Sequence, residues 1–232
     1  MLLLAAGRGS RFGGPLPKAY LLLAGRPLLV HSVQRLVASV TTSDRVQVIV
    51  VVHPTDREAH LAAWLPELRR LVADRGTLHV VDGGASRQES MLRGFAAADD
   101  DVDVVLVHDA ARALVPSHAV RECLDAALRT GAALLAIPAT DTQKKVVEGL
   151  VASTLDRSGI WLAQTPQVIR PDLLRRAAAN AAALGIEGTD DVSLVERMGQ
   201  PVAVVPGSVT NLKITHPGDL ALAEAILAAG LA

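Results

Sequence analysis

Residues 46–81 read VQVIVVVHPTDREAHLAAWLPELRRLVADRGTLHVV. The stretch opens with an apolar run over 46–52, continues with an amphipathic segment over 55–75 and closes with a second apolar run over 77–81. A short run that is apolar throughout is typical of a strand buried on both faces of a sheet. The strand–helix–strand order predicts two parallel strands connected by a helix.

The same alternation extends along the whole chain. Strand-like runs also occupy 1–5, 102–108 and 132–137, and helical patterns occupy 27–39, 86–98, 116–130, 171–184, 190–198 and 217–231. We therefore expect an α/β fold, with a mostly parallel sheet and helices on both faces, that binds ligands at the carboxyl ends of its strands. Two further segments are predicted from residue type alone, 164–167 as a polar loop and 211–215 as a short late strand.

One segment interrupts this alternation. Between residues 140 and 157, two short β-prone runs flank Glu148-Gly149, which predicts a β-hairpin. Because an isolated hairpin is marginally stable in water, this one should pack on another surface. We expect a single domain over 1–232 whose protruding β-arm, 139–158, embraces a second copy of the chain.

Composition excludes several classes of protein. With 232 residues, half of them apolar, the chain is long enough for one domain with a large core. The lone cysteine, Cys123, excludes an internal disulfide and a multi-cysteine metal site. A net charge of −1 and 2% aromatic residues argue against a nucleic-acid partner. No apolar run reaches the ~20 residues of a membrane span. We expect a soluble protein of the reducing cytoplasm with no membrane partner.

The loop after the first strand combines glycines with two cations, Arg11 and Lys18. Glycines let backbone amides approach an anion closely, so the loop suits a polyphosphate. It is not a dinucleotide-binding fingerprint, because Phe12 stands where the third glycine belongs. It is not a P-loop either, because no Gly-Lys-Ser/Thr closes it. The alternative is a glycine-rich surface turn with two solvated cations.

A second glycine loop reads DGGASRQES over residues 82–90. Ser86 and Glu89 have the spacing of a helix capping box, which is the favoured interpretation of this segment taken alone. The alternative is that Gly83 and Gly84 let a base lie against the backbone while Ser90 reads its edge.

A third cluster, VHDAAR over 107–112, places Asp109 at the end of a strand predicted to be buried. A carboxylate there could hold a divalent cation or a substrate hydroxyl. The alternative is a surface ion pair with Arg112, worth under about 1 kcal/mol. The strand-end position favours a functional role. Periodicity alone would place Lys213 on a solvated face.

Taken in order, these motifs resemble those of one family, the 2-C-methyl-D-erythritol 4-phosphate cytidylyltransferases. The ordered set is specific, although each motif alone is weak. The matching positions span nearly the whole chain and are Ala5-Ala6-Gly7, Gly9, Arg11, Pro17-Lys18, Asp82-Gly83-Gly84, Arg87, Ser90, 107–112, Asp141-Thr142, Asp156-Arg157, Thr165-Pro166-Gln167, Thr189-Asp190 and 211–215.

The resemblance implies a Rossmann-like nucleotidyltransferase sheet and a homodimer with crossing β-arms. It also implies transfer of a cytidylyl group from CTP to 2-C-methyl-D-erythritol 4-phosphate (methylerythritol phosphate), a step of non-mevalonate isoprenoid synthesis. Mg²⁺ would be bound mainly by the triphosphate, with Asp109 nearby.

The resemblance also assigns roles to single residues. The residues implied in catalysis are Arg11, Lys18 and Lys213. Those implied in nucleotide binding are Ala6, Gly7, Gly9, Gly84, Ser90 and Asp109. Those implied in acceptor binding are Arg112, Thr142, Arg157, Thr165 and Thr189, with Arg157 reaching in from the arm of the partner subunit.

Three other functions compete with this one. A cytidylyltransferase acting on ribitol 5-phosphate would share the CTP half of the site, and Arg157, Thr165 and the arm favour methylerythritol phosphate over it. A non-catalytic nucleotide-binding regulator would lose the cations, yet Arg11, Lys18 and Lys213 are all present. An NAD-dependent enzyme would need the missing third glycine.

Overall fold

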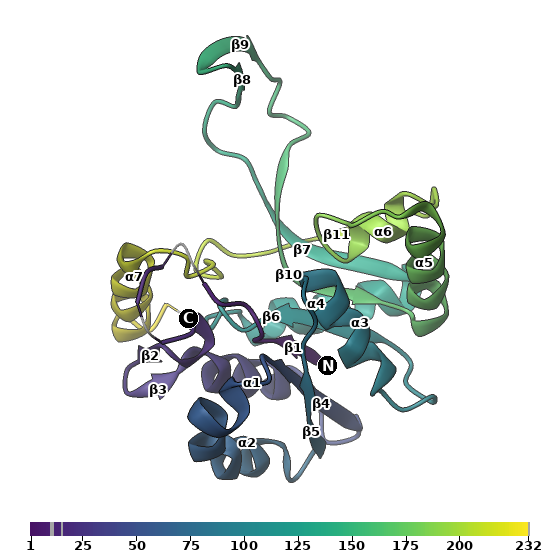
Figure 1. Cartoon of the computed structure of the whole chain (residues 1–232). Coiled ribbons are helices and arrows are strands. Elements are labelled where there is room, and N and C mark those ends of the chain that lie inside the picture. Colours follow the sequence, from purple (N-terminus) through teal and green to yellow (C-terminus); the bar gives the residue numbers. More distant parts are fainter. Residues whose placement is uncertain (10–11, 15, 232) are drawn as a thin grey trace.

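The computed structural model describes residues 1–9, 12–14 and 16–231, and a seven-stranded sheet forms its centre (Figure 1). The strand order is β11-β7-β10-β6-β1-β4-β5. These strands are β1 (Leu2–Leu4), β4 (Val46–Val52), β5 (Gly76–Asp82), β6 (Val105–Asp109), β7 (Ala132–Pro138), β10 (Trp161–Ile169) and β11 (Ala203–Pro206). Neighbouring strands are parallel except at β10, which is antiparallel to β6 and β7. The predicted mostly parallel α/β sheet is confirmed.

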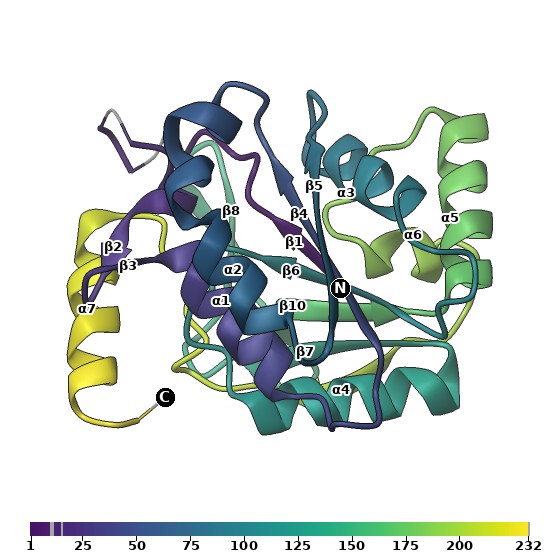
Figure 2. The same ribbon diagram turned by 90° about the horizontal axis from the view of Figure 1, so that it is seen from below.

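Helices cover both faces of this sheet, because successive residues of a strand point to opposite faces. In β4, Val48 and Val50 join one core, which includes residues of α1, α2 and α4. Ile49 and Val51 join the other core, which includes residues of α3, α5 and α6. Figure 2 shows these two groups of helices on either side of the strands. The helices are α1 (Leu28–Ala38), α2 (Leu65–Val72), α3 (Arg87–Ala96), α4 (Ser117–Thr130), α5 (Pro171–Leu184), α6 (Val192–Glu196) and α7 (Pro217–Ala228).

The segment predicted as one helix over 55–75 is broken into three pieces. A π-helical turn over Arg57–Leu61 and a 3-10 turn over Ala62–Trp64 precede α2. Pro66 explains the break, because a proline lacks the amide hydrogen of an interior helical residue but is accepted in a first turn. Near the first loop, a 3-10 turn over Lys18–Tyr20 leads into a small hairpin of β2 (Leu22–Leu23) and β3 (Arg26–Pro27).

Two predictions of local structure are wrong. The supposed polar loop over 164–167 lies inside β10, where Gln164, Thr165 and Gln167 are at most 5% exposed. Their polar atoms bond to other side chains and loops, so burial leaves them paired. The supposed late strand over 211–215 is an extended loop, which a backbone bond from Ile214 N to Ala111 O anchors beside the end of β6.

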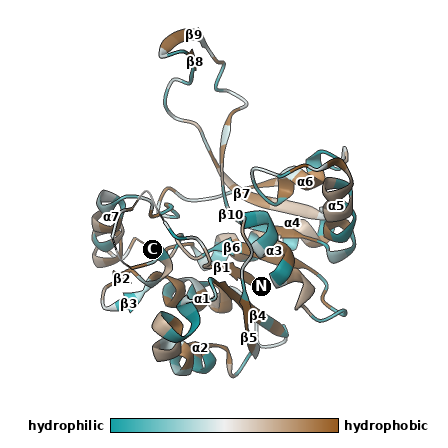
Figure 3. Cartoon of the chain, in the orientation of Figure 1, coloured by the Kyte–Doolittle hydropathy of each residue, from teal (hydrophilic) through white to brown (hydrophobic). Residues whose placement is uncertain are grey.

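The predicted hairpin is confirmed and projects away from the body of the molecule (Figure 1). It consists of β8 (Lys144–Val147) and β9 (Leu150–Thr154), joined by a turn at Glu148 and Gly149, which both have positive φ. A bond from Ala139 N to Ile160 O closes its base. Figure 3 shows apolar residues near its tip, and Val146, Val147, Leu150 and Val151 are more than half exposed.

The parallel strands also fix where the loops gather. β1, β4, β5 and β6 share one direction, and β7 shares it too, because β6 and β7 are both antiparallel to β10. Both glycine loops and the hairpin therefore leave the sheet at its carboxyl edge. Within the part of the chain that the structure describes, no helix is long and apolar enough to cross a membrane.

Candidate active site

A pocket of about 510 Å³ opens at this carboxyl edge. It lies between the loop after β1, the loop between β5 and α3, and the end of β6. Seven of the residues to which the resemblance assigns a role line it, namely Ala6, Gly7, Lys18, Gly84, Ser90, Asp109 and Lys213. Arg8, His53 and Arg87 line it as well. The pocket therefore brings together the two glycine loops and the late lysine, which are far apart in the chain.

The first loop positions Lys18 through a close contact with Gly9. Gly9 has a φ of +66°, and a Cβ added to it would lie 2.4 Å from Lys18 Cγ. Only glycine adopts this conformation readily and leaves room for the lysine stem. Gly9 thus shapes the pocket from behind Lys18. Arg11, the other cation predicted here, lies outside the described residues.

The second loop forms the predicted helix cap and also places Ser90 on the pocket wall. Ser86 caps α3, since its Oγ accepts a 3.1 Å bond from Glu89 N. Glu89 returns a bond one residue earlier than a capping box does, from Ala85 N at 2.7 Å. Ser90 Oγ accepts from Gly84 N at 3.0 Å and faces the pocket. The cap and the pocket wall are therefore made by different serines of one loop.

Asp109 lies at the end of β6 and is nearly buried, with 8% of the residue exposed. Its Oδ2 accepts a 2.6 Å bond from Lys213 Nζ, and its Oδ1 accepts from Arg87 Nε and Nη2 at 3.2 and 3.1 Å. Burial alone would raise the pKa of this carboxyl, but Arg87 and Lys213 outweigh burial and hold the pKa well below its usual range. Asp109 is therefore a fixed negative charge between two cations.

The alternative prediction of a surface ion pair between Asp109 and Arg112 is wrong. Arg112 instead donates to two backbone carbonyls, those of Asn211 at 2.6 Å and Ala163 at 3.3 Å. It therefore ties the loop at 211–215 to β10 next to the pocket. Lys213 is also not simply solvated, because Asp109 holds its ammonium group.

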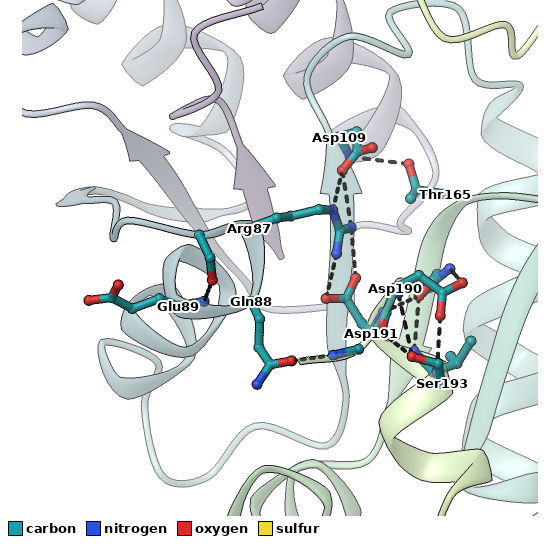
Figure 4. Close-up of polar contacts among 12 residues, drawn as sticks. Arg87, Gln88, Glu89, Asp109, Thr165, Asp190, Asp191 and Ser193 are labelled. Carbon is teal, nitrogen blue, oxygen red and sulfur yellow. Dashed lines mark hydrogen bonds and ion pairs between the residues drawn. The ribbon is translucent and has the colours of Figure 1, made fainter. Parts of the chain in front are cut away.

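Arg87 and Asp191 complete a buried charge cluster that sequence reasoning did not assign (Figure 4). Arg87 Nη1 and Nη2 donate to Asp191 Oδ1 and Oδ2, both at 2.8 Å. The Asp191 side chain is 1% exposed, and burial raises the pKa of its carboxyl against the opposing effect of Arg87. Burial lowers the pKa of Arg87, but Asp191 and Asp109 outweigh burial and raise it. The available signal was that Arg87 is itself a matched position and that Asp191 directly follows the matched pair Thr189-Asp190.

Thr165 lies behind Asp109 rather than on the pocket wall. Its Oγ1 accepts a 3.1 Å bond from Asp109 N and lies 3.0 Å from His108 Nδ1. His108 Nε2 lies 3.1 Å from Arg112 O, which can only accept, so Nε2 carries the proton and Thr165 donates to Nδ1. Burial lowers the pKa of His108 to about 4, which keeps the ring neutral.

Three predicted acceptor residues lie apart from the pocket within a single chain. Thr142 and Arg157 are exposed near the base of the arm, where Arg157 donates to Thr140 O. Thr189 is exposed in the loop before α6. None of the three belongs to the described lining of the pocket.

A second hollow, about 490 Å³, lies at the opposite end of the sheet. Its lining holds four aspartates, Asp44, Asp99, Asp101 and Asp103, against two arginines, Arg45 and Arg121, and neither of the glycine loops just described. Acidic side chains repel a polyphosphate, so the carboxyl-edge pocket is the better nucleotide site.

Comparison with known proteins identifies the family. The family model described as 2-C-methyl-D-erythritol 4-phosphate cytidylyltransferase matches residues 1–229. The chain is 50% identical to the enzyme of that name from Chromobacterium violaceum, over 97% of this chain and 96% of that protein. It is 43% identical to the one from Geotalea uraniireducens, over 96% and 94%. The crystal structure of the enzyme of the same name from Thermus thermophilus matches this chain with a TM-score of 0.77 and 36% identity, over 97% of each chain. The chain belongs to the 2-C-methyl-D-erythritol 4-phosphate cytidylyltransferase family.

Proposed function

We propose that this chain transfers the cytidylyl group of CTP to methylerythritol phosphate, giving 4-diphosphocytidyl-2-C-methyl-D-erythritol and pyrophosphate. The observation that carries the proposal is the convergence of Lys18, Lys213 and both glycine loops on one pocket. This arrangement supplies cations and backbone amides where a triphosphate needs them, and family membership names the nucleotide and the acceptor.

In this reaction, an oxygen of the acceptor phosphate attacks the α-phosphorus of CTP. The bond from the α-phosphorus to the bridging oxygen breaks, and pyrophosphate leaves with that electron pair. No general base is needed, because a phosphate is already anionic at neutral pH. Charge gathers on the α-phosphate oxygens and the leaving group, so positioned cations provide most of the catalysis. We assign this role to Lys18, Lys213 and Arg11.

The nucleotide half of the site is assigned to the glycine loops and Asp109. Ala6, Gly7, Gly84 and Ser90 line the pocket, and Gly9 supports Lys18. Backbone groups of the second loop are assigned to the base edge. A Cβ on Gly83 would lie 2.5 Å from Ala6 Cβ, so glycine at this position lets the two loops pack closely beside the pocket. Asp109 is assigned to the ribose side.

The acceptor half is assigned to Arg112, Thr142, Arg157, Thr165 and Thr189. Because Thr142 and Arg157 lie near the base of an arm that carries exposed apolar residues, we assign the arm at 139–158 to a homodimer interface. Arg157 of one subunit would then complete the site of the other. We propose that residues 1–232 form one domain and that the arm belongs to it.

We assign Mg²⁺ as the divalent cation of this reaction. No group of three or more His, Cys, Asp or Glu side chains among the described residues is placed to hold a metal ion. Asp109 offers one carboxylate, and both of its oxygens already accept bonds from cations. This donor set fits a metal that arrives with the triphosphate and takes most of its oxygen ligands from it, with Asp109 as the protein's contribution. When bound, the ion would neutralise triphosphate charge.

A cytoplasmic location, without nucleic-acid or membrane partners, fits the near-zero net charge and the buried, unpaired Cys123.

The test is release of pyrophosphate from CTP with Mg²⁺, using methylerythritol phosphate and ribitol 5-phosphate in parallel. Release with methylerythritol phosphate alone is expected. Release with ribitol 5-phosphate alone would keep the CTP site and overturn the acceptor assignment. Binding of CTP with no release in either reaction would favour a nucleotide-binding regulator.

A further inference from the structure

Three segments of the site meet at the side chain of Arg87 (Figure 4). Arg87 is the first residue of α3, directly after the second glycine loop. Its guanidinium contacts Asp109 at the end of β6 and Asp191, which directly precedes α6. The first two segments belong to the nucleotide half of the site, and the third adjoins Thr189 in the acceptor half.

The hydrogen bonds of Arg87 are almost fully used by these two carboxylates. Nε donates to Asp109, Nη2 donates to both aspartates, and Nη1 donates to Asp191. A guanidinium has five N–H donors, so four are engaged and one remains. Although Arg87 lines the pocket, it has little capacity left to bind a phosphate. Its geometry is that of a positioning residue.

The contacts form a continuous chain from the acceptor loop to the reacting region. Asp191 holds Arg87, Arg87 holds Asp109 Oδ1, and Asp109 Oδ2 holds the ammonium group of Lys213. The Asp191 side chain is 1% exposed and that of Asp109 is 11% exposed. Buried charges are costly to leave unpaired, so moving one member displaces the others.

The acceptor loop is attached to α3 by a second contact as well. Gln88 Oε1 accepts a 2.8 Å bond from Gly188 N. The loop around Thr189 is therefore attached to the first turn of α3, the helix that follows the second glycine loop. The two contacts differ in kind, because the Gln88 contact is neutral and does not reach Asp109 or Lys213.

We propose that Arg87 couples the two halves of the active site, so that binding of the nucleotide strengthens binding of the acceptor through the Asp109–Arg87–Asp191 bridge. This inference rests on the proposed function. By linkage, the acceptor must then strengthen nucleotide binding by the same factor.

The test measures this factor with a non-reacting α,β-methylene analogue of CTP. Its dissociation constant is determined by calorimetry with and without saturating methylerythritol phosphate. The wild-type ratio is expected to be ~5-fold or more. Arg87→Lys keeps the charge but loses the two-pronged contact with Asp191. We expect its ratio to fall to about one, with the affinity for the analogue alone changed less than ~3-fold.

Three further variants separate coupling from simple structural support. In Asp191→Asn the ratio should also fall to about one. This variant takes the place of Arg87→Lys in the test if Arg87→Lys does not fold. Gln88→Ala should keep the ratio, because it cuts the neutral tether and leaves the charges in place. Arg121→Lys is the matched control, since Arg121 is also about one-third exposed and paired with an aspartate, Asp44, but lies at the other end of the sheet.

The outcomes are distinct. The coupling role would be overturned if the wild-type ratio of dissociation constants were one, or if Arg87→Lys or Asp191→Asn kept the wild-type ratio. It would also be overturned if Gln88→Ala lowered the ratio as much as Arg87→Lys does. If Arg87→Lys greatly weakens binding of the analogue in the absence of methylerythritol phosphate, Arg87 is a nucleotide ligand, and this result would also overturn the coupling role. Failure of the wild-type chain to bind methylerythritol phosphate would instead reject the proposed function.

Discussion

Lys213 Nζ lies 2.6 Å from Asp109 Oδ2, across a separation of 104 residues. The side chain of Lys213 remains 37% exposed, whereas that of Asp109 is 11% exposed. The carboxylate thus holds the lysine at the pocket while its other oxygen is held by Arg87. An arriving phosphate can take over the ammonium group without leaving Asp109 unpaired.

Lys213→Ala should lower kcat by ~10²–10³, by analogy with the loss of other preorganised donors to a transition state. The fold should persist, because Arg87 still neutralises Asp109. Steady-state kinetics and a thermal melt measure the two effects. Arg170→Ala serves as the control, since Arg170 forms an exposed ion pair with Asp172, and its kcat should be unchanged. An unchanged kcat in Lys213→Ala would remove Lys213 from the mechanism.

Gly83→Ala should weaken CTP binding. The new Cβ would lie 2.5 Å from Ala6 Cβ and 3.0 Å from Ser90 Oγ, so the two loops would be pushed apart. Overpacking of this kind costs ~1–3 kcal/mol. Calorimetric titration with CTP and urea unfolding measure the effect on affinity and on stability. In the control, Gly218→Ala, nothing lies within 4 Å of the added Cβ, so CTP affinity should not change. Wild-type affinity in Gly83→Ala would mean that the loops do not flank the base.

Mixing two inactive variants, Arg157→Ala and Lys18→Ala, should restore activity if Arg157 acts across subunits. Half of randomly mixed dimers are mixed, and each has one intact site of two, so about a quarter of wild-type activity is expected. Mixing is done after partial unfolding and refolding, and pyrophosphate release is measured. Each variant refolded alone is the control. No recovery, in a sample that light scattering shows to be dimeric, would place Arg157 in its own subunit's site.

The stability of the fold should decrease below neutral pH, partly through His31. Burial lowers the pKa of this ring, whose Nε2 donates a 2.8 Å bond to Leu23 O. Between the lowered folded pKa and the unfolded value of about 6.5, the unfolded chain binds more protons, so stability falls as pH falls through this window. His31→Gln should show a smaller drop in the urea midpoint between ~pH 7.5 and ~pH 5.5 than the wild type. An equal drop would show that His31 does not contribute.

The limits of sequence reasoning here follow from where each residue finds its partners. The strand at 46–52 could be predicted with its exact bounds, because six of its seven residues are buried valine or isoleucine and only Gln47 interrupts the apolar run. β10 was missed because Gln164 and Gln167 are polar. Their partners inside the fold include Asn211, Asp190 and the amide of Asp191. These partners are distant in sequence, so no local pattern announces them.

The charge cluster was hidden for a related reason. Arg87 is separated from Asp109 by 22 residues and from Asp191 by 104. Local spacing offered Arg112 as an alternative partner of Asp109, but Arg112 binds carbonyl groups. Resemblance to a family identified most residues of the pocket wall, but it could not show which of them are held by buried partners.

The antiparallel strand β10 has a mechanical consequence. It starts at exposed Trp161, next to the base of the hairpin, and runs to buried Ile169 between β6 and β7. The strand that follows the projecting hairpin therefore carries Thr165, whose hydroxyl accepts a hydrogen bond from the amide of Asp109. A pull on the hairpin would pass through residues 155–160 and along β10 to Thr165, where the pairing with β7 shifts register between Ala163 and Gln167. The position of the hairpin and the position of Asp109 at the pocket are therefore mechanically linked through one strand.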